Sequence, residues 1–388
     1  MNTLEEAKKI NDWVFAIRRE FHADPEKSME EVRTSARVAE ELRKMGIEVK
    51  RIGATGVLGT LVGAAPGKVI ALRADMDALS IAEQTGFDYS SRNPGLMHAC
   101  GHDFHTAMLL GAAKVLSGMK DQLKGTVKFM FQPGEEVAKG ARSMVEGGVL
   151  ENPKVDMAFG MHVISDLPMG KVVLQDGGFM ASGDNWECVI KGVTAHGSSP
   201  WQGIDAIVCA SAIVQSLQTL VSRVNDARDP IVINIGTFHG GDRFNIIPSK
   251  VEMTGMNRAF SVRAREGMPL WMEEVIKGTC AAYRCTYEFN YNFSCAPLIN
   301  DPQATAFAKE SVAKVIGAEN IMQIPRIMGS EDFSEYAMKV PSTFMVLGVR
   351  NPAKDCVYSQ HSEHYKADED CIPYGVASFV QMATDFLS

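Results

Sequence analysis

Residues 68–75 read KVIALRAD, and residues 126–132 read TVKFMFQ. Both stretches have the length and apolar composition of buried β-strands. A helical pattern near 103–118 lies between them, and a further apolar stretch, MAFGMHV, follows at 157–163. Because strands alternate with helices, this part of the chain predicts an α/β domain with a central, mostly parallel sheet and helices on both faces.

The flanking segments extend this pattern in both directions. Their apolar spacing predicts helices at about 4–22, 29–45, 302–316 and 331–338, a final helix from about 371, and strands at 57–63 and 343–348. The chain thus returns to α/β character near its C-terminal end.

The middle of the chain has a different order of elements. It predicts a strand at 185–193, a helix at 203–224, strands at 231–239 and 249–258, a helix at 263–283 and a strand at 284–292. This β-α-β-β-α-β order is typical of ferredoxin-like domains. We therefore expect an α+β domain at 184–295, inserted into an α/β domain that is formed by residues 1–183 and 296–388.

Composition narrows the class of protein. A length of 388 residues favours two domains. The net charge of -8 is spread without long runs of one sign, which argues against nucleic acid or an anionic membrane as partner. No stretch resembles a signal peptide or a membrane span, so we expect a cytoplasmic protein. The eight cysteines include no Cys-x-x-Cys pair and are expected to be reduced thiols.

The strongest chemical signal is the stretch MHACGHDFH at 97–105. Cysteine and histidine are ligands that Zn²⁺, Mn²⁺, Co²⁺ or Ni²⁺ can use, and Gly101 permits a tight loop that turns Cys100 and His102 towards one ion. The motif lies between a strand and a helix, where α/β sheets place their ligands. A buried cysteine among surface histidines is the competing interpretation, because spacing alone does not identify a metal site.

A second signal, FQPGEE at 131–136, ends an apolar strand. Two buried adjacent carboxylates would repel each other without a cation. A metal resolves this conflict if Glu136 binds the ion while Glu135 takes a proton from an activated water. A bare pair of glutamates is, however, more commonly part of a solvated loop.

Further polar residues follow other apolar strands. Asp75 and Asp77 end KVIALRAD and could orient a metal ligand, although aspartate is also common in turns. His162 and His361 follow apolar or turn segments, and either alone would more often be structural. The combined set is large enough for two adjacent ions that share one bridging ligand. The candidate ligands are Cys100, His102, Glu136, His162 and His361.

The inserted domain carries its own polar set. His196 follows a strand in TAHGSSP, Asn245 lies in a turn, and Arg258 ends a strand. Histidine or asparagine can stabilise a developing oxyanion, and arginine can hold a carboxylate bidentately. Turn structure or surface charge would explain each of them equally well.

Together these residues resemble peptidase family M20, specifically its aminoacylase and hippurate hydrolase branch. The similarity spans nearly the whole chain and rests on the stretches ALRADMDAL, MHACGHDFHTAMLLGAA, FMFQPGEE, GMHV, KGVTAHGSSP, FNIIP and GSEDFSEYA and the segment around His361. The resemblance implies a two-metal catalytic domain with an inserted lid domain that forms a homodimer. It also implies that Cys100 bridges the ions, that Glu135 is the general base, and that His196, Asn245 and Arg258 face the substrate.

The function that this resemblance implies is hydrolysis of N-acyl amino acids by a metal-activated water, with two divalent ions per subunit. The resemblance does not decide whether Asp75 or Asp77 orients the metal site. A dipeptidase or aminopeptidase of the same family is the first alternative. A non-catalytic metal-bound dimer and a redox role for Cys100 are weaker alternatives, because Glu135 and every candidate ligand are present and no second cysteine lies near Cys100 in sequence.

Overall fold

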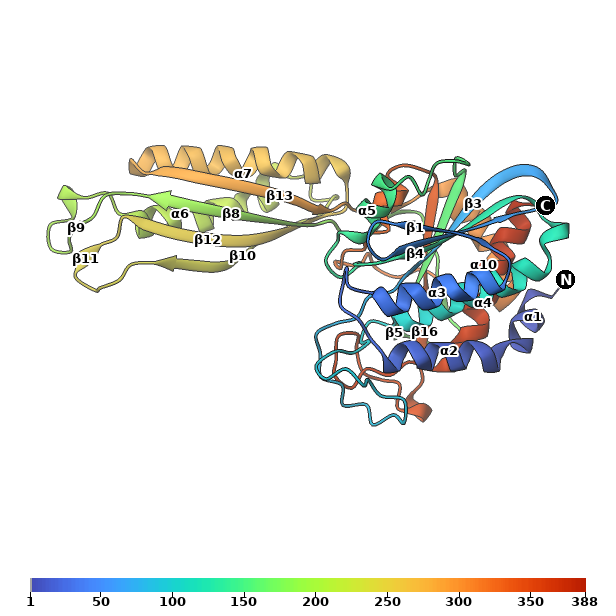
Figure 1. The fold of residues 1–388 in the computed structure, drawn as a ribbon. Coiled ribbons are helices and arrows are strands. Elements are labelled where there is room, and N and C mark those ends of the chain that lie inside the picture. The colour runs from blue at the N-terminus through green and yellow to red at the C-terminus, as the bar shows by residue number, and fades with distance from the viewer. Residues whose placement is uncertain (1) are drawn as a thin grey trace. The chain divides into compact units, whose positions relative to one another are not determined.

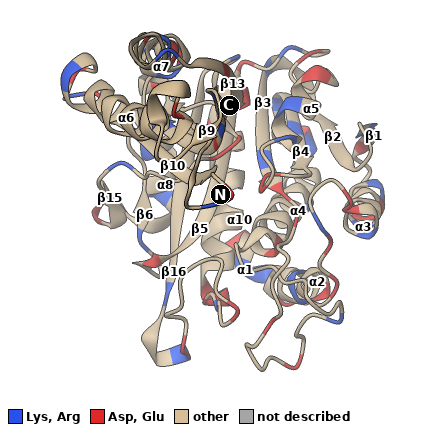
Figure 2. Ribbon diagram, turned by 90° about the vertical axis from the view of Figure 1, so that its left-hand side faces the viewer, with Lys and Arg blue, Asp and Glu red and all other residues tan. Residues whose placement is uncertain are grey.

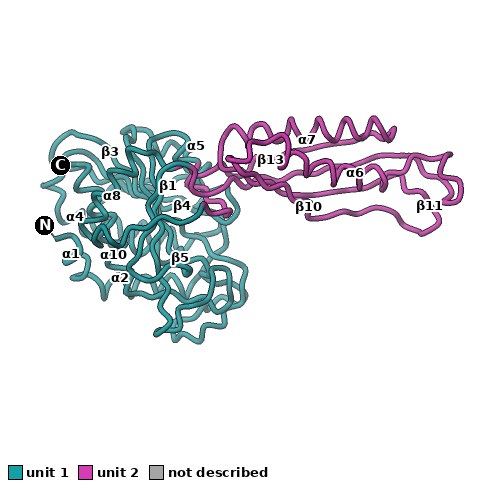
Figure 3. The backbone as a smooth tube through the Cα atoms, turned by 180° about the vertical axis from the view of Figure 1, so that it is seen from behind, with its two compact units in different colours: residues 1–177, 300–325, 335–388 teal, residues 178–299, 326–334 magenta. Residues whose placement is uncertain are grey.

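The computed structural model describes residues 2–388 and divides the chain into two compact units (Figure 3). Unit 1 consists of Met1–Gly177, Asn300–Pro325 and Glu335–Ser388. Unit 2 consists of Gly178–Ile299 and Arg326–Ser334. The expected insertion at 184–295 lies inside unit 2, which begins somewhat earlier and also takes a short segment from the C-terminal part of the chain.

Unit 1 is built on an eight-stranded mixed sheet with the order β1-β2-β4-β3-β5-β16-β6-β15 (Figure 1). The central neighbours β4, β3, β5 and β16 run parallel, as expected, whereas β1 and β2 add an antiparallel flank. The strands are β1 (Glu48–Ile52), β2 (Gly56–Val62), β3 (Ala65–Asp75), β4 (Lys124–Gln132), β5 (Met157–Pro168), β6 (Val172–Val173), β15 (Ile321–Met322) and β16 (Ser342–Arg350).

One face of this sheet supplies the main core. Alternate residues of β3, namely Ile70, Leu72 and Ala74, are fully buried in one apolar cluster with the helices, as the two-residue period of a strand requires. A short helix that carries Met144 packs closely on the opposite face. A Cβ added at Gly56 of the sheet would lie only 2.4 Å from Sδ of Met144. The helices are α1 (Thr3–Lys9), α2 (Asn11–Ala23), α3 (Val32–Lys44), α4 (His102–Gly118), α5 (Gly140–Glu146), α8 (Pro302–Ile316), α9 (Ser334–Ala337) and α10 (Ile372–Phe386).

The N-terminal helix differs from its prediction. One helix was expected at about 4–22, but the structure has two, which meet at Ile10. The first is tied to α10 by a hydrogen bond of 2.8 Å from Oγ1 of Thr3 to Oε1 of Gln381, whereas α2 packs on α4. Because the two helices pack on different neighbours, a bend between them lets each bury its apolar face.

Unit 2 has the expected β-α-β-β-α-β order. Its four-stranded antiparallel sheet has the order β10-β12-β8-β13, and Trp186 of β8 lies in its core at 1% exposure. The elements are β8 (Gly183–Lys191), α6 (Ala206–Thr219), β10 (Ile231–Gly240), β12 (Lys250–Ala259), α7 (Val262–Tyr283) and β13 (Thr286–Cys295). A separate two-stranded ribbon is formed by β9 (Ala195–His196) and β11 (Ile246–Ile247). Short strands β7 (Gly177–Met180) and β14 (Leu298–Asn300) lie where the chain passes between the units.

Helix α6 and the π-helical turn after it, Ala206–Val224, form the one described helix that is long and apolar enough to cross a membrane by length and composition. Its buried side chains, including Ile213 and Leu217, pack in the core of unit 2. All eight cysteines lie within the described residues and are buried, and none of them forms a disulfide bond. Along α2 and α3 of unit 1, basic and acidic residues are interspersed, as the blue and red segments of the ribbon show (Figure 2).

Candidate metal centre

The site begins where β3 and β4 end side by side. These parallel strands are in register with Asp75 opposite Gln132, so the segments that follow them start at the same edge of the sheet. The first segment carries Asp77, and the second carries Glu135 and Glu136. Strand register therefore brings together two motifs that lie far apart in the sequence.

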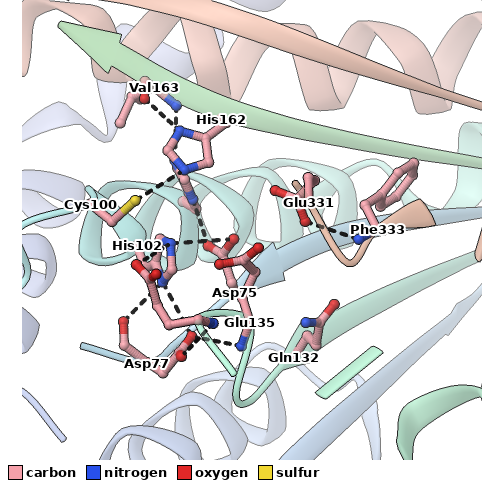
Figure 4. A network of polar contacts seen from close by, with 12 residues as sticks. Asp75, Asp77, Cys100, His102, Gln132, Glu135, His162, Val163, Glu331 and Phe333 are labelled. Atoms are coloured by element: carbon pink, nitrogen blue, oxygen red, sulfur yellow. Dashed lines mark hydrogen bonds and ion pairs between the residues drawn. The ribbon is translucent and has the colours of Figure 1, made fainter. Parts of the chain in front are cut away.

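Asp77 is the residue that joins these two segments. Its carboxylate accepts hydrogen bonds from the backbone N–H groups of Glu135 and Glu136, each at 3.1 Å. Nδ1 of His102 lies 2.9 Å from the backbone oxygen of Asp77 and 3.2 Å from its Oδ1 (Figure 4). Because both of these neighbours are acceptors, Nδ1 carries the ring proton and Nε2 presents a lone pair. Asp77 therefore fixes both the ring of His102 and the loop of the two glutamates.

The loop before α4 positions Cys100 and His102. Gly101 caps the helix at φ +92°, a left-handed conformation, and an added Cβ would lie 2.4 Å from Cγ2 of Val163. Only glycine fits this position without strain. Sγ of Cys100 then lies 3.4 Å from Nε2 of His162, whose Nδ1 is 2.5 Å from the backbone oxygen of Val163. His162 thus also presents a lone pair at Nε2.

Glu136 and His361 complete the cluster. Oε1 of Glu136 lies 3.9 Å from Nε2 of His102 and 3.5 Å from Nε2 of His361. His361 adopts φ +65°, which is rare for a non-glycine residue, and its N–H donates to the backbone oxygen of Ala99 at 2.8 Å. The structure therefore brings all five predicted ligands together, with ligand atoms in groups of three that lie within 4.8 Å of one another.

The donor atoms of this cluster fit divalent metal ions. Nε2 of His102 and Oε1 of Glu136 are buried without a hydrogen-bond partner, which is costly unless a ligand satisfies them. Burial alone would lower the pKa of His102, but the neighbouring Asp75 and Cys100 raise this pKa well above its usual range. Burial raises the pKa of the Cys100 thiol, so a cation is needed to hold it as a thiolate. The unsatisfied atoms of His102 and Glu136 are therefore the observation that fits a bound cation.

Asp75 lies beside this cluster but has different partners. Its Oδ2 accepts from Nη1 of Arg73 at 2.7 Å, and its Oδ1 lies 2.5 Å from Nδ1 of His105. The N–H of Val163 donates to Nε2 of His105 at 2.9 Å, so both ring nitrogens of this buried histidine are used. Asp75, His102 and His105 are close enough to hold an ion, yet the adjacent Arg73 cation and the occupied lone pair of His105 disfavour one there.

The sequence left open whether Asp75 or Asp77 orients the metal site, and the contacts of the two residues bear on this question. Both carboxylates lie near the ring of His102, since Oδ1 of Asp77 is 3.2 Å from Nδ1 and Oδ2 of Asp75 is 3.7 Å from Nε2. Asp75 also contacts His105 and, through it, the strand that carries His162. The sequence interpretation assigned no role to His105, although it lies in the same motif. Its spacing of three residues from His102 within a helix was an available signal, since such residues share a face.

The three candidate residues of unit 2 lie in two places. His196 pairs with Ile246 across the β9–β11 ribbon, and the N–H of Gly197 donates to the backbone oxygen of Asn245 at 2.8 Å. His196 is exposed, and its Nδ1 lies 2.8 Å from Oγ of Ser198. Arg258 is half-buried at the end of β12, where Nη1 donates to the backbone oxygen of Ser182 at 3.3 Å. His196 and Asn245 are therefore neighbours, and Arg258 is separate from them in the fold.

Comparison with known proteins identifies the family of the chain. Residues 71–385 match the model of Peptidase family M20/M25/M40. IAA-amino acid hydrolase ILR1-like 4 of Arabidopsis thaliana is 40% identical over 390 residues, which are 99% of this chain and 88% of that protein. N-acyl-L-amino acid amidohydrolase of Geobacillus stearothermophilus is 42% identical over 304 residues, which are 77% of this chain and 82% of that protein.

A solved structure gives the same result for the fold. The dinuclear metal binding peptidase from the M20 family of Bacillus subtilis superposes with a TM-score of 0.85 at 34% identity, covering 98% of this chain and 99% of that one. Fold, cluster and relatives together define a metal-dependent hydrolase. The chain belongs to Peptidase family M20/M25/M40, which confirms the resemblance seen in the sequence.

Proposed function

We propose that the protein hydrolyses the amide bond of N-acyl amino acids of the hippurate or N-acetyl amino acid kind. The observation that carries this proposal is the convergence of five ligand side chains and Glu135 at the carboxyl edge of β3 and β4. The substrate class follows the relatives, one of which is an N-acyl-L-amino acid amidohydrolase and another an IAA-amino acid hydrolase.

Two divalent ions would be held by the five predicted ligands, with Cys100 shared between them. Bound ions supply Lewis acidity for the amide carbonyl and acidify a water. The donor set of thiolate, imidazole and carboxylate suits Zn, Mn, Co or Ni, and availability decides among such metals. The proposed ligands are Cys100, His102, Glu136, His162 and His361.

Glu135 is proposed as the general base. Its backbone is held by Asp77, and its carboxylate belongs to a group with His102 and Glu136 whose ligand atoms lie within 4.8 Å of one another. It would take a proton from the attacking water and return this proton to the leaving amine. Asp77 keeps His102 in the tautomer that offers Nε2, and Asp75 supports the site from behind through His105.

We propose that residues of unit 2 bind the substrate. His196 would stabilise the oxyanion, and Asn245, its neighbour in the fold, would donate a hydrogen bond to the carboxylate of the amino acid. Arg258 would hold the carboxylate of the amino acid, because a guanidinium binds a carboxylate bidentately. Hydrolysis of substrates that have a free α-amine in place of the acyl group would instead indicate a dipeptidase or aminopeptidase. This is the alternative to be tested.

The test is amine release by purified protein that has been stripped of metal and reloaded separately with Zn, Mn, Co or Ni. The panel comprises N-acetyl, N-benzoyl and indoleacetyl amino acids together with dipeptides. We expect metal-dependent release from acyl amino acids. Release from dipeptides alone would overturn the proposed substrate class in favour of the peptidase, and binding of metal without any release would favour a non-catalytic protein.

We further propose a homodimer that is formed through unit 2. Helix α6 supports this proposal because it is apolar, yet Val208 is 49% exposed and Ile207 and Val214 are only half-buried. Large exposed apolar side chains in such a helix are typical of a protein–protein contact. Light scattering should give twice the chain mass, and Val208→Glu should halve it; a monomeric wild type would contradict the proposal. A cytoplasmic location stays a prediction.

A further inference from the structure

Glu31 is a buried charged residue that no sequence motif singled out. It has 0% exposure and, among the described residues, it forms no ion pair. It stands at the N-terminal cap of α3, where its own backbone oxygen accepts from the N–H of Ser35 at 3.0 Å. Burying a carboxylate without a cation is costly, so its presence calls for an explanation from its hydrogen bonds.

The carboxylate of Glu31 accepts three hydrogen bonds. Oε1 accepts from the backbone N–H groups of Met29 and Gly134, both at 2.8 Å, and Oε2 accepts from Oγ1 of Thr55 at 2.7 Å. Gly134 is 103 residues away in sequence and directly precedes Glu135. Burial raises the pKa of Glu31, and its hydrogen bonds oppose that effect. The side chain therefore fastens the loop of the proposed base to the start of α3.

Glu31 and Asp77 together hold three consecutive N–H groups of this loop. The N–H of Gly134 donates to Glu31, and the next two, of Glu135 and Glu136, donate to Asp77. Gly134 has φ +58°, and a Cβ there would lie 2.4 Å from Sδ of Met29. The loop thus lies directly against the segment before α3, and two carboxylates from separate parts of the chain fix its backbone.

The segment that carries Glu31 is itself fixed. Oγ of Ser28 donates to Oδ2 of Asp77 at 2.6 Å, so the two carboxylates belong to one hydrogen-bonded unit. Glu26 accepts from the N–H groups of Arg33 at 3.0 Å and Thr34 at 2.8 Å, which satisfies the first turn of α3. A rigid support of this kind can set the position of a catalytic side chain to a fraction of an ångström.

We propose that Glu31 is a positioning residue for Glu135: it sets the place of the base through the N–H of Gly134 without touching metal or substrate. This inference rests on the proposed function of Glu135. Removal of the Glu31 carboxylate should therefore lower kcat while the metal ligands keep their ions, because a misplacement of about 1 Å can cost about 100-fold in rate.

The test compares Glu31→Ala, Glu31→Gln and Glu41→Gln in the metal-loaded full chain. Glu41 is the matched control: a buried glutamate of the same helix that pairs with Arg37 and Lys44 instead of the loop. We expect kcat to fall about 100-fold in Glu31→Ala, with two ions still bound and KM changed less than about threefold. Glu31→Gln keeps an oxygen that can accept from the N–H groups of Met29 and Gly134, so its kcat should lie much closer to the wild-type value than that of Glu31→Ala.

Hydrogen exchange of the peptide that covers 132–137 gives a readout that needs no activity. We expect faster exchange at Gly134, Glu135 and Glu136 in Glu31→Ala than in the wild type or the Glu41→Gln control. Unchanged exchange would overturn the proposal, even if the wild type proved inactive and the proposed function failed. Equal kcat in Glu31→Ala and the control, or loss of metal in step with kcat, would also overturn it.

Discussion

The metal cluster of unit 1 and the β9–β11 ribbon of unit 2 are built in opposite ways. In the cluster, the side chains of His102, Asp75 and Asp77 have 0% exposure and each has its neighbours fixed by hydrogen bonds. In the ribbon, the side chain of His196 is exposed and its hydrogen bonds stay within residues 196–198, and Phe244 is 99% exposed. The buried residues of the cluster are held by internal hydrogen bonds, whereas the ribbon presents its side chains to solvent.

This difference separates two roles. Buried, mutually supporting ligands are what a metal centre needs, because geometry and tautomer must be set before the ion arrives. Exposed polar and aromatic groups on a ribbon suit contacts that form only when a substrate or another chain is present. Substitutions in the cluster should therefore act on metal binding, whereas those in unit 2 should act on substrate binding.

The largest effect is expected from loss of the bridging ligand. Cys100→Ala removes the sulfur proposed to be shared by two ions, so the variant should bind fewer than two ions per chain and turnover should fall to background. Metal content by elemental analysis checks this. The control is Cys356→Ala, which removes another buried thiol of unit 1. Two ions in Cys100→Ala would show that the ligand assignment is wrong.

A smaller effect is expected at His105, behind the ligands. The glutamine of His105→Gln cannot keep both hydrogen bonds of the imidazole, the one to Asp75 and the one from the N–H of Val163. The second of these bonds holds the strand that carries His162. Metal affinity should fall by about 10- to 100-fold, the range for loss of such a supporting contact. Chelator competition measures it, with the exposed His239→Gln of unit 2 as control. Equal metal affinities in the two variants would show that His105 does not support the metal ligands.

In unit 2 the expected effect is on KM alone. Arg258→Ala should raise KM by about 10- to 100-fold for an N-acyl amino acid, because a charged hydrogen bond to the carboxylate is lost. Metal content should stay unchanged, and the carboxamide analogue of the substrate should be affected little. Arg263→Ala, an exposed arginine of the same unit, is the control. An equal loss for acid and amide would refute the carboxylate contact.

The smallest effect concerns stability at low pH. Burial alone would raise the pKa of Glu83, but the hydrogen bond to His22 lowers it to about 2. A carboxylate whose folded pKa is lowered stabilises the fold above its unfolded pKa and loses this contribution as pH falls towards the folded value. The difference in Tm between the wild type and Glu83→Gln should therefore shrink between about pH 5 and pH 2. A constant difference would contradict the pairing.

Much of this molecule could be predicted from local pattern. The helix at 302–316 has the predicted bounds, and the β-α-β-β-α-β order of the middle segment appears as a four-stranded antiparallel sheet. These elements have clear apolar periods, and each is a local property of the chain. The bend at Ile10 could not be seen, because the apolar spacing continues through it and only the two packing partners differ.

Some residues of the candidate site can likewise be predicted from local sequence motifs, whereas others depend on contacts between distant parts of the chain. Cys100, His102 and Glu136 could be proposed as ligands from the sequence because their residue types and motifs carry chemistry. The contacts of Asp75 and Asp77 with His102 and His105 join distant parts of the chain, and the proposed role of Glu31 depends on a contact 103 residues away. Such contacts are set by strand register and helix packing, and no local spacing encodes them.

The most direct test of the central claim is the turnover of Glu135→Gln measured together with its metal content. We expect two ions per chain, as in the wild type, and a fall in kcat of about 100- to 10,000-fold on an N-acyl amino acid, because the proton acceptor is gone while every proposed ligand remains. Retained turnover with both ions bound would contradict this claim and would require another base.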